Sequence, residues 1–193
     1  MSDSIFDPRE YAYKAGLAAD YMRGLIRSPK FLVGEVFQVK INVTSLKKSA
    51  GQSSEQVSEL LFGEEIIIYE ILNGWAWGQS QTDGYVGYVS MDHISCELQE
   101  NTHAVTALRA FVYEQPDIKA STITCLSMAS QLSITHSKGL FAYIENLGWI
   151  FEKSIRTLGG VESDFVSVAQ KFTGTPYLWG GRSSFGIDCS GLV

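Results

Sequence analysis

The sequence has few cysteines, few prolines and no excess of positive charge. Its 193 residues include three cysteines and four prolines, and 15 lysine and arginine residues face 21 aspartate and glutamate residues, a formal net charge of −6. A protein that binds nucleic acid needs clustered basic side chains, and no run of lysine and arginine provides them. Cys96, Cys125 and Cys189 lie too far apart for a disulfide framework or a CxxC metal pair. We therefore expect no nucleic-acid partner, no metal, no cofactor and a reducing compartment, with Cys96 and Cys125 buried as small apolar residues.

Long hydrophobic runs are also missing. No segment approaches the roughly 18 apolar residues of a membrane span, and the N-terminus lacks the basic and apolar regions of a signal peptide. These absences predict a cytoplasmic protein without a membrane span. The sequence is nevertheless 45% hydrophobic and only 19% charged, which is typical of packed domains rather than of a disordered chain. It carries no signal for the oligomeric state.

The first 35 residues have a helical pattern. Apolar residues recur at mostly helical spacing after Pro8, which favours a short amphipathic helix from Asp7 to about Ile26. From Phe31 the pattern changes to short β-type runs broken by glycine and asparagine. We expect an N-terminal helical segment over 1–35, followed by strands.

Residues 65–89 predict a meander of three strands. A buried run over 66–72 leads into Asn73-Gly74, a dipeptide preferred in two-residue hairpin turns because both positions need positive φ. A return strand over 75–79 and a third strand over 85–89 follow, separated by a turn at residues 82–84.

A second copy of this pattern follows the first. Residues 43–47 (VTSLK) reappear as 105–109 (VTALR) at an offset of 62, and 87–89 (GYV) are echoed by 148–150 (GWI) at an offset of 61. Between them, the strand, turn and strand order recurs over 131–144. The pattern predicts two similar small β-barrels, over residues 36–97 and 98–158.

These repeats resemble bacterial SH3-like (SH3b) domains. The resemblance rests on Gly63-Glu64 before a buried strand, the Gly74-Trp75 hairpin and the closing Gly87-Tyr88-Val89, and it covers about 36–97 and 103–156. By itself it implies a binding or docking module.

Residues 159–193 begin a third unit. Asp164 is placed to cap a helix whose apolar residues Phe165, Val168, Ala169 and Phe172 share one face, and Gly174 is placed to end it. The expected fold class is therefore mainly β with short helices: two tandem SH3-like barrels, then the N-terminal fragment of an α+β papain-like domain.

The final residues carry the strongest motif. Pro176-Tyr177-Leu178-Trp179-Gly180-Gly181, followed by Asp188-Cys189-Ser190-Gly191-Leu192-Val193, resembles the signature of the NlpC family of papain-like cysteine peptidases, which cut bacterial cell-wall peptides. The resemblance implies a hydrolase that needs no cofactor and acts on murein peptide.

The residues of the motif have expected roles. Cys189 would start a helix, where unpaired N–H groups and the helix dipole stabilise the thiolate nucleophile. By resemblance, Tyr177 would help to stabilise the oxyanion, and Asp188 and Ser190 would contact the substrate. Asp188 could instead serve only as a helix N-cap, and Tyr177 could be a simple core aromatic.

The general base is missing from this motif. A cysteine peptidase needs a base, normally histidine, and in the NlpC family it follows the nucleophile. The three histidines, His93, His103 and His136, all lie in the barrel repeats. We therefore expect the chain to be a fragment, truncated after the nucleophile motif and inactive as it stands.

The order helix, SH3b, SH3b and NlpC-type domain resembles that of intracellular peptidases that cleave murein peptides with a free N-terminal L-Ala. In those, an acidic residue and a tyrosine of the first barrel bind the substrate's amine; the candidates here are Glu55 and Tyr85. The second barrel has no counterpart of residues 83–86. Glu55 could instead be a solvated loop carboxylate, and Tyr85 a half-buried strand aromatic.

Two functions from different classes follow. The favoured one is a γ-D-glutamyl-L-diamino acid endopeptidase of murein recycling, which uses Cys189 to form an acyl-enzyme that water hydrolyses. The alternative is a non-catalytic module whose barrels bind wall peptide or another protein. A papain-like thiol could also carry out acyl transfer, because the nucleophile does not fix the acceptor.

Overall fold

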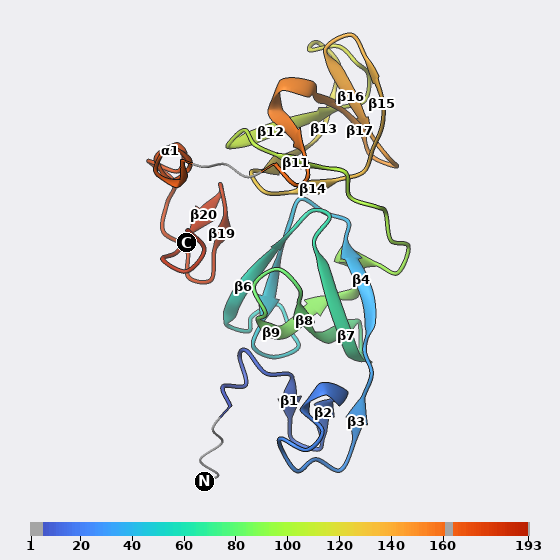
Figure 1. Ribbon diagram of the computed structural model, residues 1–193, viewed down its shortest axis with the longest axis vertical. Coiled ribbons are helices and arrows are strands. Elements are labelled where there is room, and N and C mark those ends of the chain that lie inside the picture. The colour runs from blue at the N-terminus through green and yellow to red at the C-terminus, as the bar shows by residue number, and fades with distance from the viewer. Residues whose placement is uncertain (1–5, 161–163, 193) are drawn as a thin grey trace.

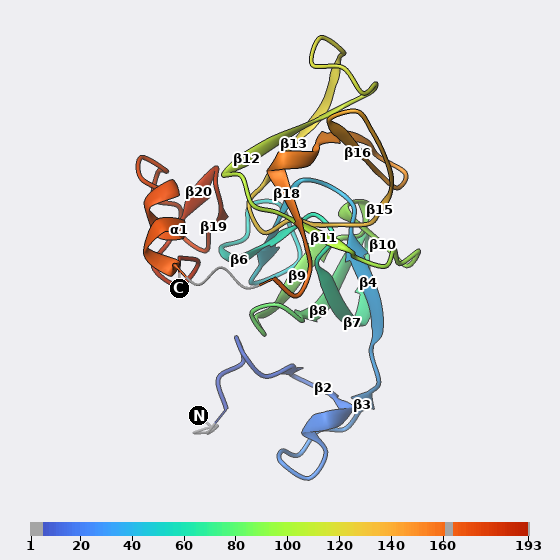
Figure 2. The ribbon, with the colours of Figure 1, turned by 45° about the horizontal axis from the view of Figure 1, so that its top comes forward.

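The computed structural model describes residues 6–160 and 164–192, and these residues are mainly β (Figure 1). The N-terminal segment, a first β unit and a second β unit follow one another along the long axis. The C-terminal segment lies beside β6 (Gln56–Leu61) in both ribbon views (Figures 1 and 2). The expected mainly β fold class is confirmed.

The first β unit is one seven-stranded sheet curled around a core. Its sheet order is β10-β4-β7-β8-β9-β5-β6. Besides β6, it contains β4 (Glu35–Val39), β5 (Val43–Lys47), β7 (Glu65–Leu72), β8 (Trp75–Ser80), β9 (Val86–Ser90), a 3₁₀ turn η2 (Met91–His93) and β10 (Ile94–Ser95). The predicted meander is correct, and Asn73 and Gly74 have the φ values of 51° and 79° that the hairpin needs. Inward-facing residues such as Leu46, Leu60 and Ile66 are fully buried.

The second β unit repeats this arrangement in two sheets. Their orders are β14-β11-β18 and β13-β12-β17-β16-β15. The elements are β11 (His103–Val105), β12 (Arg109–Tyr113), β13 (Thr122–Ser127), β14 (Gln131–Leu132), β15 (Ile134–Lys138), β16 (Phe141–Ile144), β17 (Gly148–Phe151), η3 (Glu152–Ser154) and β18 (Ile155–Thr157). Val112, Leu126, Leu132 and Ile150 form the centre of its core.

Strand pairing corrects the register of the internal repeat. Val39 pairs with Ile94 in the first unit, and Val105 pairs with Ile155 in the second, so Val105 is the counterpart of Val39. The offset is therefore 66 in the first half of each repeat, and the predicted match of residues 43–47 to 105–109 is wrong by four residues. Towards the C-terminal end the offset is 61, as predicted. The two offsets differ by five residues, and this difference falls in the β8–β9 connection. In the first unit the strands around this connection pair Gly78 with Gly87, whereas in the second unit they pair Ile144 with Gly148, so the second connection is five residues shorter.

The N-terminal segment is extended, so the helix predicted over residues 7–26 is wrong. It contains β1 (Tyr13–Lys14), β2 (Leu17–Ala19), a 3₁₀ turn η1 (Asp20–Met22) and β3 (Phe31–Leu32). Gly16 and Gly24 have φ values of 82° and 85°, which a helix does not accommodate. Ala12, Leu17 and Ala19 of this segment instead pack against Tyr69, Trp77 and Val86 of the first barrel, while Tyr21 and Leu25 are exposed. Tertiary burial has outweighed local propensity.

The two barrels meet at a close backbone contact. The Gln131 N–H donates to the Phe62 carbonyl at 2.8 Å, and the Asn101 side chain bridges Gly63 and Gln131. Gly63 has φ of 79°, and a Cβ there would lie 2.1 Å from the Gln131 carbonyl oxygen. Only glycine fits this joint.

The C-terminal segment contains the predicted helix, α1 (Phe165–Lys171), and a small hairpin of β19 (Arg182–Ser183) and β20 (Gly186–Ile187). The Asp164 carboxylate accepts a hydrogen bond from the Ser167 N–H at 3.0 Å, which confirms the predicted cap. Phe165 is 79% exposed, and the helix borders an apolar hollow that Leu61 and Met128 line from the barrels.

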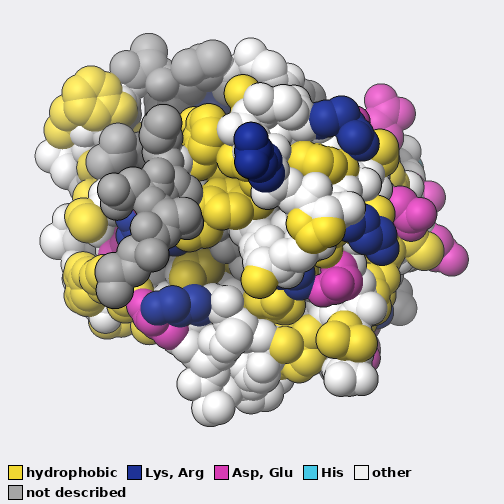
Figure 3. Space-filling view, turned by 90° about the horizontal axis from the view of Figure 1, so that it is seen from below, with side chains coloured by type: hydrophobic (Ala, Val, Ile, Leu, Met, Phe, Trp, Pro, Cys, Tyr) yellow, Lys and Arg dark blue, Asp and Glu magenta, His cyan; other side chains and the backbone are white. Residues whose placement is uncertain are grey.

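From the N-terminal end, lysine, arginine and acidic side chains are dispersed among apolar and polar ones (Figure 3). No helix in residues 6–160 and 164–192 has the length and hydropathy that crossing a bilayer requires.

Candidate active site

The glycines of the C-terminal motif bring its two halves together. Gly180 has φ of 69°, and the Gly181 N–H donates to the Leu178 carbonyl at 2.9 Å, which turns the chain into β19. After the β19–β20 hairpin the chain returns, and a Cβ on Gly191 would lie 2.2 Å from the Gly181 carbonyl oxygen. The residues around Cys189 therefore pack directly against the Gly180-Gly181 turn.

Asp188 organises this contact. Its Oδ1 accepts hydrogen bonds from the Ser190 N–H, the Ser190 hydroxyl and the Gly191 N–H at 2.9–3.0 Å, and its Oδ2 accepts one from the Gly180 N–H at 2.8 Å. Burial acts to raise the pKa of Asp188, but the hydrogen bonds from Gly191, Ser190 and Gly180 outweigh it and lower the pKa below its ordinary value. Asp188 thus stays a carboxylate and fixes the turn that carries Cys189.

Cys189 lies on the surface, in a turn over residues 189–191. The expected start of a helix at Cys189 is not seen in residues 188–192, which form this turn instead. The backbone of Tyr177 forms an isolated parallel β-bridge with Ile187. Tyr177 is 68% exposed, so it is not a core aromatic. The nucleophile candidate and the oxyanion candidate are both accessible.

The segment is attached to the first barrel through Arg182, which sequence reasoning missed. The Arg182 guanidinium donates to both carboxylate oxygens of Glu64 at 3.0 and 3.1 Å, and its Nε lies 3.3 Å from Asp83 Oδ2. The Arg182 N–H also donates to Glu59 Oε2 at 2.9 Å. The Glu64 side chain is only 2% exposed and that of Arg182 16%. No sequence signal pairs residues that lie 118 positions apart.

Burial affects the charges of this cluster differently. Burial raises the pKa of Glu59 above its ordinary value, although hydrogen bonds from Arg182 and Ser183 partly oppose it. For Arg182, burial acts to lower the pKa, but Glu64, Asp83 and Glu59 together raise it, so the guanidinium stays charged. The contact between barrel and segment is thus an ionic cluster largely shielded from water.

The five-residue insertion of the first barrel faces this segment. Asp83 Oδ1 accepts a hydrogen bond from the Tyr85 N–H at 3.1 Å, while its Oδ2 accepts one from the Ser58 hydroxyl at 2.6 Å. A small pocket lies between the insertion and the motif. Its lining comprises Val57, Ser58, Asp83, Tyr85, Gly180, Arg182, Asp188, Ser190 and Gly191. Three sequence-predicted site residues, Tyr85, Asp188 and Ser190, therefore share one pocket.

Glu55 is placed differently. Its carboxylate pairs with the Lys48 ammonium at 2.9 Å on the surface, and it does not line the pocket. The acidic side chain that does reach the pocket from the first barrel is Asp83. The five-residue difference between the repeats was the signal that could have singled it out.

The histidines lie away from the pocket lining. His93 Nδ1 is 2.7 Å from the Thr44 hydroxyl, His103 lies in β11, and His136 stacks on Tyr143. The described residues contain no group of three or more histidine, cysteine, aspartate or glutamate side chains that could hold a metal ion. Of the other cysteines, Cys96 is exposed, so its predicted burial is wrong, and Cys125 is half-buried.

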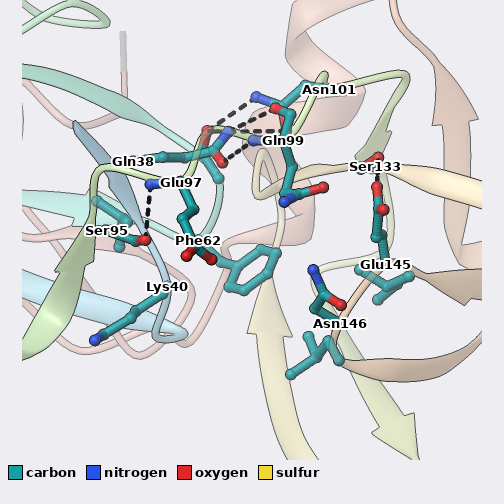
Figure 4. A pocket seen from close by; sticks show the side chains of 14 residues that line it. Gln38, Lys40, Phe62, Ser95, Glu97, Gln99, Asn101, Ser133, Glu145 and Asn146 are labelled. Atoms are coloured by element: carbon teal, nitrogen blue, oxygen red, sulfur yellow. Dashed lines mark hydrogen bonds between the residues drawn. The ribbon is translucent and has the colours of Figure 1, made fainter. Parts of the chain in front are cut away.

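A larger cavity of about 310 Å³ lies between the two barrels (Figure 4). On one side Gln38 holds the linker, with its Oε1 accepting from the Gln99 N–H at 2.9 Å and its Nε2 donating to the Gly63 carbonyl at 3.1 Å. Glu145 accepts from the Ser133 hydroxyl on the other side. Because its lining comes from both barrels and from the linker between them, the cavity is part of the joint between the barrels.

Several known proteins are similar to this chain in sequence. The profile described as "Bacterial dipeptidyl-peptidase Sh3 domain" matches residues 46–94. "Dipeptidyl-peptidase 6" of Lysinibacillus sphaericus is 26% identical over 164 residues, which cover 72% of this chain and 60% of the relative. "Gamma-D-glutamyl-L-lysine dipeptidyl-peptidase" of Bacillus subtilis (strain 168) is 26% identical over 156 residues, covering 70% of this chain and 50% of the relative. The chain thus spans about half to three-fifths of the length of these relatives.

Solved structures have the same fold. An NlpC/P60 family protein from Bacillus cereus ATCC 10987 superimposes with a TM-score of 0.66 at 16% identity, over 82% of this chain and 70% of that one. An NlpC/P60 endopeptidase from Photobacterium damselae subsp. piscicida gives 0.55 at 17% identity, over 81% and 41%. The chain therefore shares sequence with proteins named dipeptidyl-peptidases, matches a bacterial SH3 domain profile over residues 46–94, and shares its fold with NlpC/P60 proteins.

Proposed function

We propose that this chain provides the nucleophile, and the amine-binding half of the substrate site, of a cysteine peptidase that cleaves the γ-D-glutamyl-diamino acid bond of murein peptides with a free N-terminal L-Ala. One observation carries the proposal: Tyr85 and Asp83 of the first barrel share a pocket with Asp188 and Ser190, which flank Cys189. The names of the curated relatives, which include γ-D-glutamyl-L-lysine dipeptidyl-peptidase, support the choice of substrate.

The chemistry would start at the Cys189 thiolate. Its sulfur attacks the γ-carbonyl carbon of D-Glu, the oxygen takes the negative charge, and collapse of this intermediate breaks the C–N bond as the leaving amine accepts a proton. Water then hydrolyses the thioester and releases L-Ala-D-Glu. The Cys189 backbone N–H and the exposed Tyr177 hydroxyl are the candidates to stabilise the oxyanion.

Substrate choice would come from the pocket. The substrate's α-ammonium group needs acceptors, and Asp83, Tyr85 and Asp188 line this pocket together with Ser190. The insertion also walls this end of the pocket, so that a peptide extended beyond L-Ala would meet the first barrel. Both effects favour release of an N-terminal dipeptide.

The general base would come from outside these 193 residues. His93, His103 and His136 do not line the pocket, and each is engaged within a barrel through a hydroxyl or an aromatic ring. We therefore infer that the isolated chain binds the peptide without turning it over. Action in the cytoplasm on recycled murein peptide is part of the same proposal.

The decisive assay uses the chain alone and the chain continued by the coding sequence that follows Val193. L-Ala-γ-D-Glu-L-Lys and its N-acetylated form are offered to both, and products are followed by mass spectrometry. The expected result is release of L-Ala-D-Glu from the free-amine peptide by the continued protein, with none from its Cys189→Ala variant.

The alternative, a non-catalytic binding module, predicts a different outcome. Binding of the peptide by the chain alone, with no turnover by the continued protein, would contradict the peptidase and support the module. Turnover of the free-amine and N-acetylated peptides at equal rates would contradict recognition of the amine by the pocket. It would not contradict the role of Cys189 as the nucleophile.

A further inference from the structure

A row of ring side chains crosses the outer face of the second barrel. Strands β12, β17, β16 and β15 lie side by side there, and their registers align Tyr113, Trp149, Tyr143 and His136. The Tyr143 ring centroid is 5.1 Å from that of Trp149 and 5.0 Å from that of His136. We call these four residues the aromatic row.

The first barrel contains the same row. The corrected offsets of 66 and 61 make Lys47, Tyr88, Trp77 and Glu70 the counterparts, in the same order. Their registers agree: Lys47 pairs with Tyr88, Tyr88 with Trp77, and Trp77 with Glu70. Even the bulge recurs, because β7 shifts register just before Glu70 and β15 just before His136.

In the first barrel this row is covered by the N-terminal segment. The Lys14 ammonium lies 4.6 Å from the Trp77 ring centroid and 5.2 Å from that of Tyr88, and it also pairs with Glu70. Trp77 is only 3% exposed, because Leu17 and neighbouring residues of the segment pack over it. The first row is thus covered by an extended segment of the same chain, with Lys14 over its two rings.

In the second barrel the aromatic row is open. His136 is exposed and Trp149 and Tyr143 are half-buried, and none of the core clusters in the described residues includes them. Beside Tyr113 on the same face, Phe111 is 54% exposed. Aromatic side chains that remain partly exposed and gather on one sheet face are typical of an interaction surface.

We propose that the aromatic row is a docking site for an extended segment of another polypeptide, which places a lysine over Tyr143 and Trp149. Charge supports this occupant, because the ring faces attract an ammonium group and the chain has a net charge of −6. The tyrosine and the tryptophan exchange places between the two rows: Tyr143 stands at the position of Trp77, and Trp149 at that of Tyr88, whose hydroxyl accepts from Lys14 at 3.1 Å. The second row therefore has one tyrosine hydroxyl as a candidate acceptor, at the neighbouring position. Since His136 replaces Glu70, the rings rather than an ion pair would hold the lysine. The proposal is independent of Cys189 and of peptidase activity.

The test uses the full chain labelled with 5-fluorotryptophan. Each of its four tryptophans then gives its own ¹⁹F NMR resonance. The probes are the peptide of residues 11–19, which contains Lys14, and the same peptide with norleucine in place of Lys14. We expect the lysine peptide to shift the Trp149 resonance, and the norleucine peptide to bind about fivefold more weakly. Tyr143→Leu and the exposed His136→Ala should each weaken binding while the remaining tryptophan resonances keep their folded positions.

A matched control removes an exposed aromatic elsewhere: Phe165→Ala, on α1, should bind the peptide as the unaltered chain does. The proposal is overturned if millimolar peptide leaves Trp149 unshifted, or if both peptides bind equally. It is also overturned if sedimentation shows the chain to be a dimer that Tyr143→Leu converts to monomer, because the occupant would then be a second copy. A shift produced by a chitin oligosaccharide but not by the peptide would overturn it in favour of a sugar.

Discussion

Arg182 and Glu64 join the segment that carries Cys189 to the first barrel. Their side chains form a two-point ion pair, with Nη1 to Oε2 at 3.0 Å and Nη2 to Oε1 at 3.1 Å, and Glu64 is almost inaccessible to water. The same guanidinium contacts Asp83, which in turn holds Tyr85. One arginine therefore connects the nucleophile segment to the insertion that borders the substrate pocket.

Loss of this arginine should cost much of the stability. Arg182→Met leaves the buried Glu64 carboxylate without its counter-charge, with the Leu61 N–H still donating to it, so we expect the free energy of unfolding to fall by about 3–5 kcal/mol. Urea denaturation measures the change, and limited proteolysis after residue 160 should accelerate. Arg182→Met combined with Glu64→Leu should recover part of the loss. The control is Lys48→Met, which breaks an exposed pair and should cost less than about 1 kcal/mol; equal losses for both single variants would contradict the assignment.

Asp188 should make stability depend on pH in the acid range. Its folded pKa is lowered, so it stabilises the fold above its unfolded value of about 3.9, and this contribution disappears as pH falls through the folded pKa. Urea denaturation of the unaltered chain and of Asp188→Asn should therefore differ at pH 6, with the unaltered chain more stable, and this difference should shrink as pH falls through the folded pKa of Asp188. A difference that does not change with pH would exclude the charge of Asp188 as its source.

Glu59 should have the opposite effect. The pKa of Glu59 is raised in the folded state, so protonation of Glu59 favours folding. The fold therefore loses stability as pH rises from the unfolded pKa of Glu59 through its folded pKa. Glu59→Gln keeps an acceptor for the Arg182 N–H but cannot ionise. Relative to the unaltered chain, the variant should therefore gain stability as pH rises above about 4.3. A constant difference between pH 3 and 7, measured by the same urea titrations, would argue against burial of this charge.

Substitutions in the insertion should change substrate choice rather than the chemical step. In the continued protein, Tyr85→Phe and Asp83→Asn should each raise KM for L-Ala-γ-D-Glu-L-Lys about tenfold, because each removes one hydrogen bond to the charged ammonium group of the substrate. The kcat should change little. Turnover of the N-acetylated peptide, already slow, should not fall further. Glu55→Gln is the matched control, since Glu55 does not line the pocket; a larger effect of Glu55→Gln would instead place the amine at that carboxylate.

The joint between the barrels should tolerate no side chain. Gly63→Ala introduces both a positive φ strain of about 1–3 kcal/mol and a clash with the Gln131 carbonyl. Urea denaturation should show this loss, and small-angle scattering should show a changed spacing of the barrels. As a control, Gly51→Ala also has positive φ but meets nothing within 4 Å, so it should leave the spacing unchanged.

The sequence by itself determined the features that depend on neighbouring residues. The hairpin at Asn73-Gly74 follows from the need for two positive φ values, and the start of α1 at Asp164 follows from a side-chain cap. The motif around Cys189 was equally visible, because its glycines and Asp188 act within a dozen residues. The repeat was also found, although its register was not, since strand pairing rather than sequence similarity fixes which residues lie side by side.

Only the tertiary structure decided what distant residues do. Lys14 and Leu17 became part of an extended segment because burying them on Trp77 of the first barrel outweighs a helical pattern of modest propensity. Arg182 pairs with Glu64, and Tyr85 and Asp188 line one pocket, because the first barrel and the C-terminal segment pack together. Contacts of this kind join positions about 100 residues apart, and no local pattern specifies them.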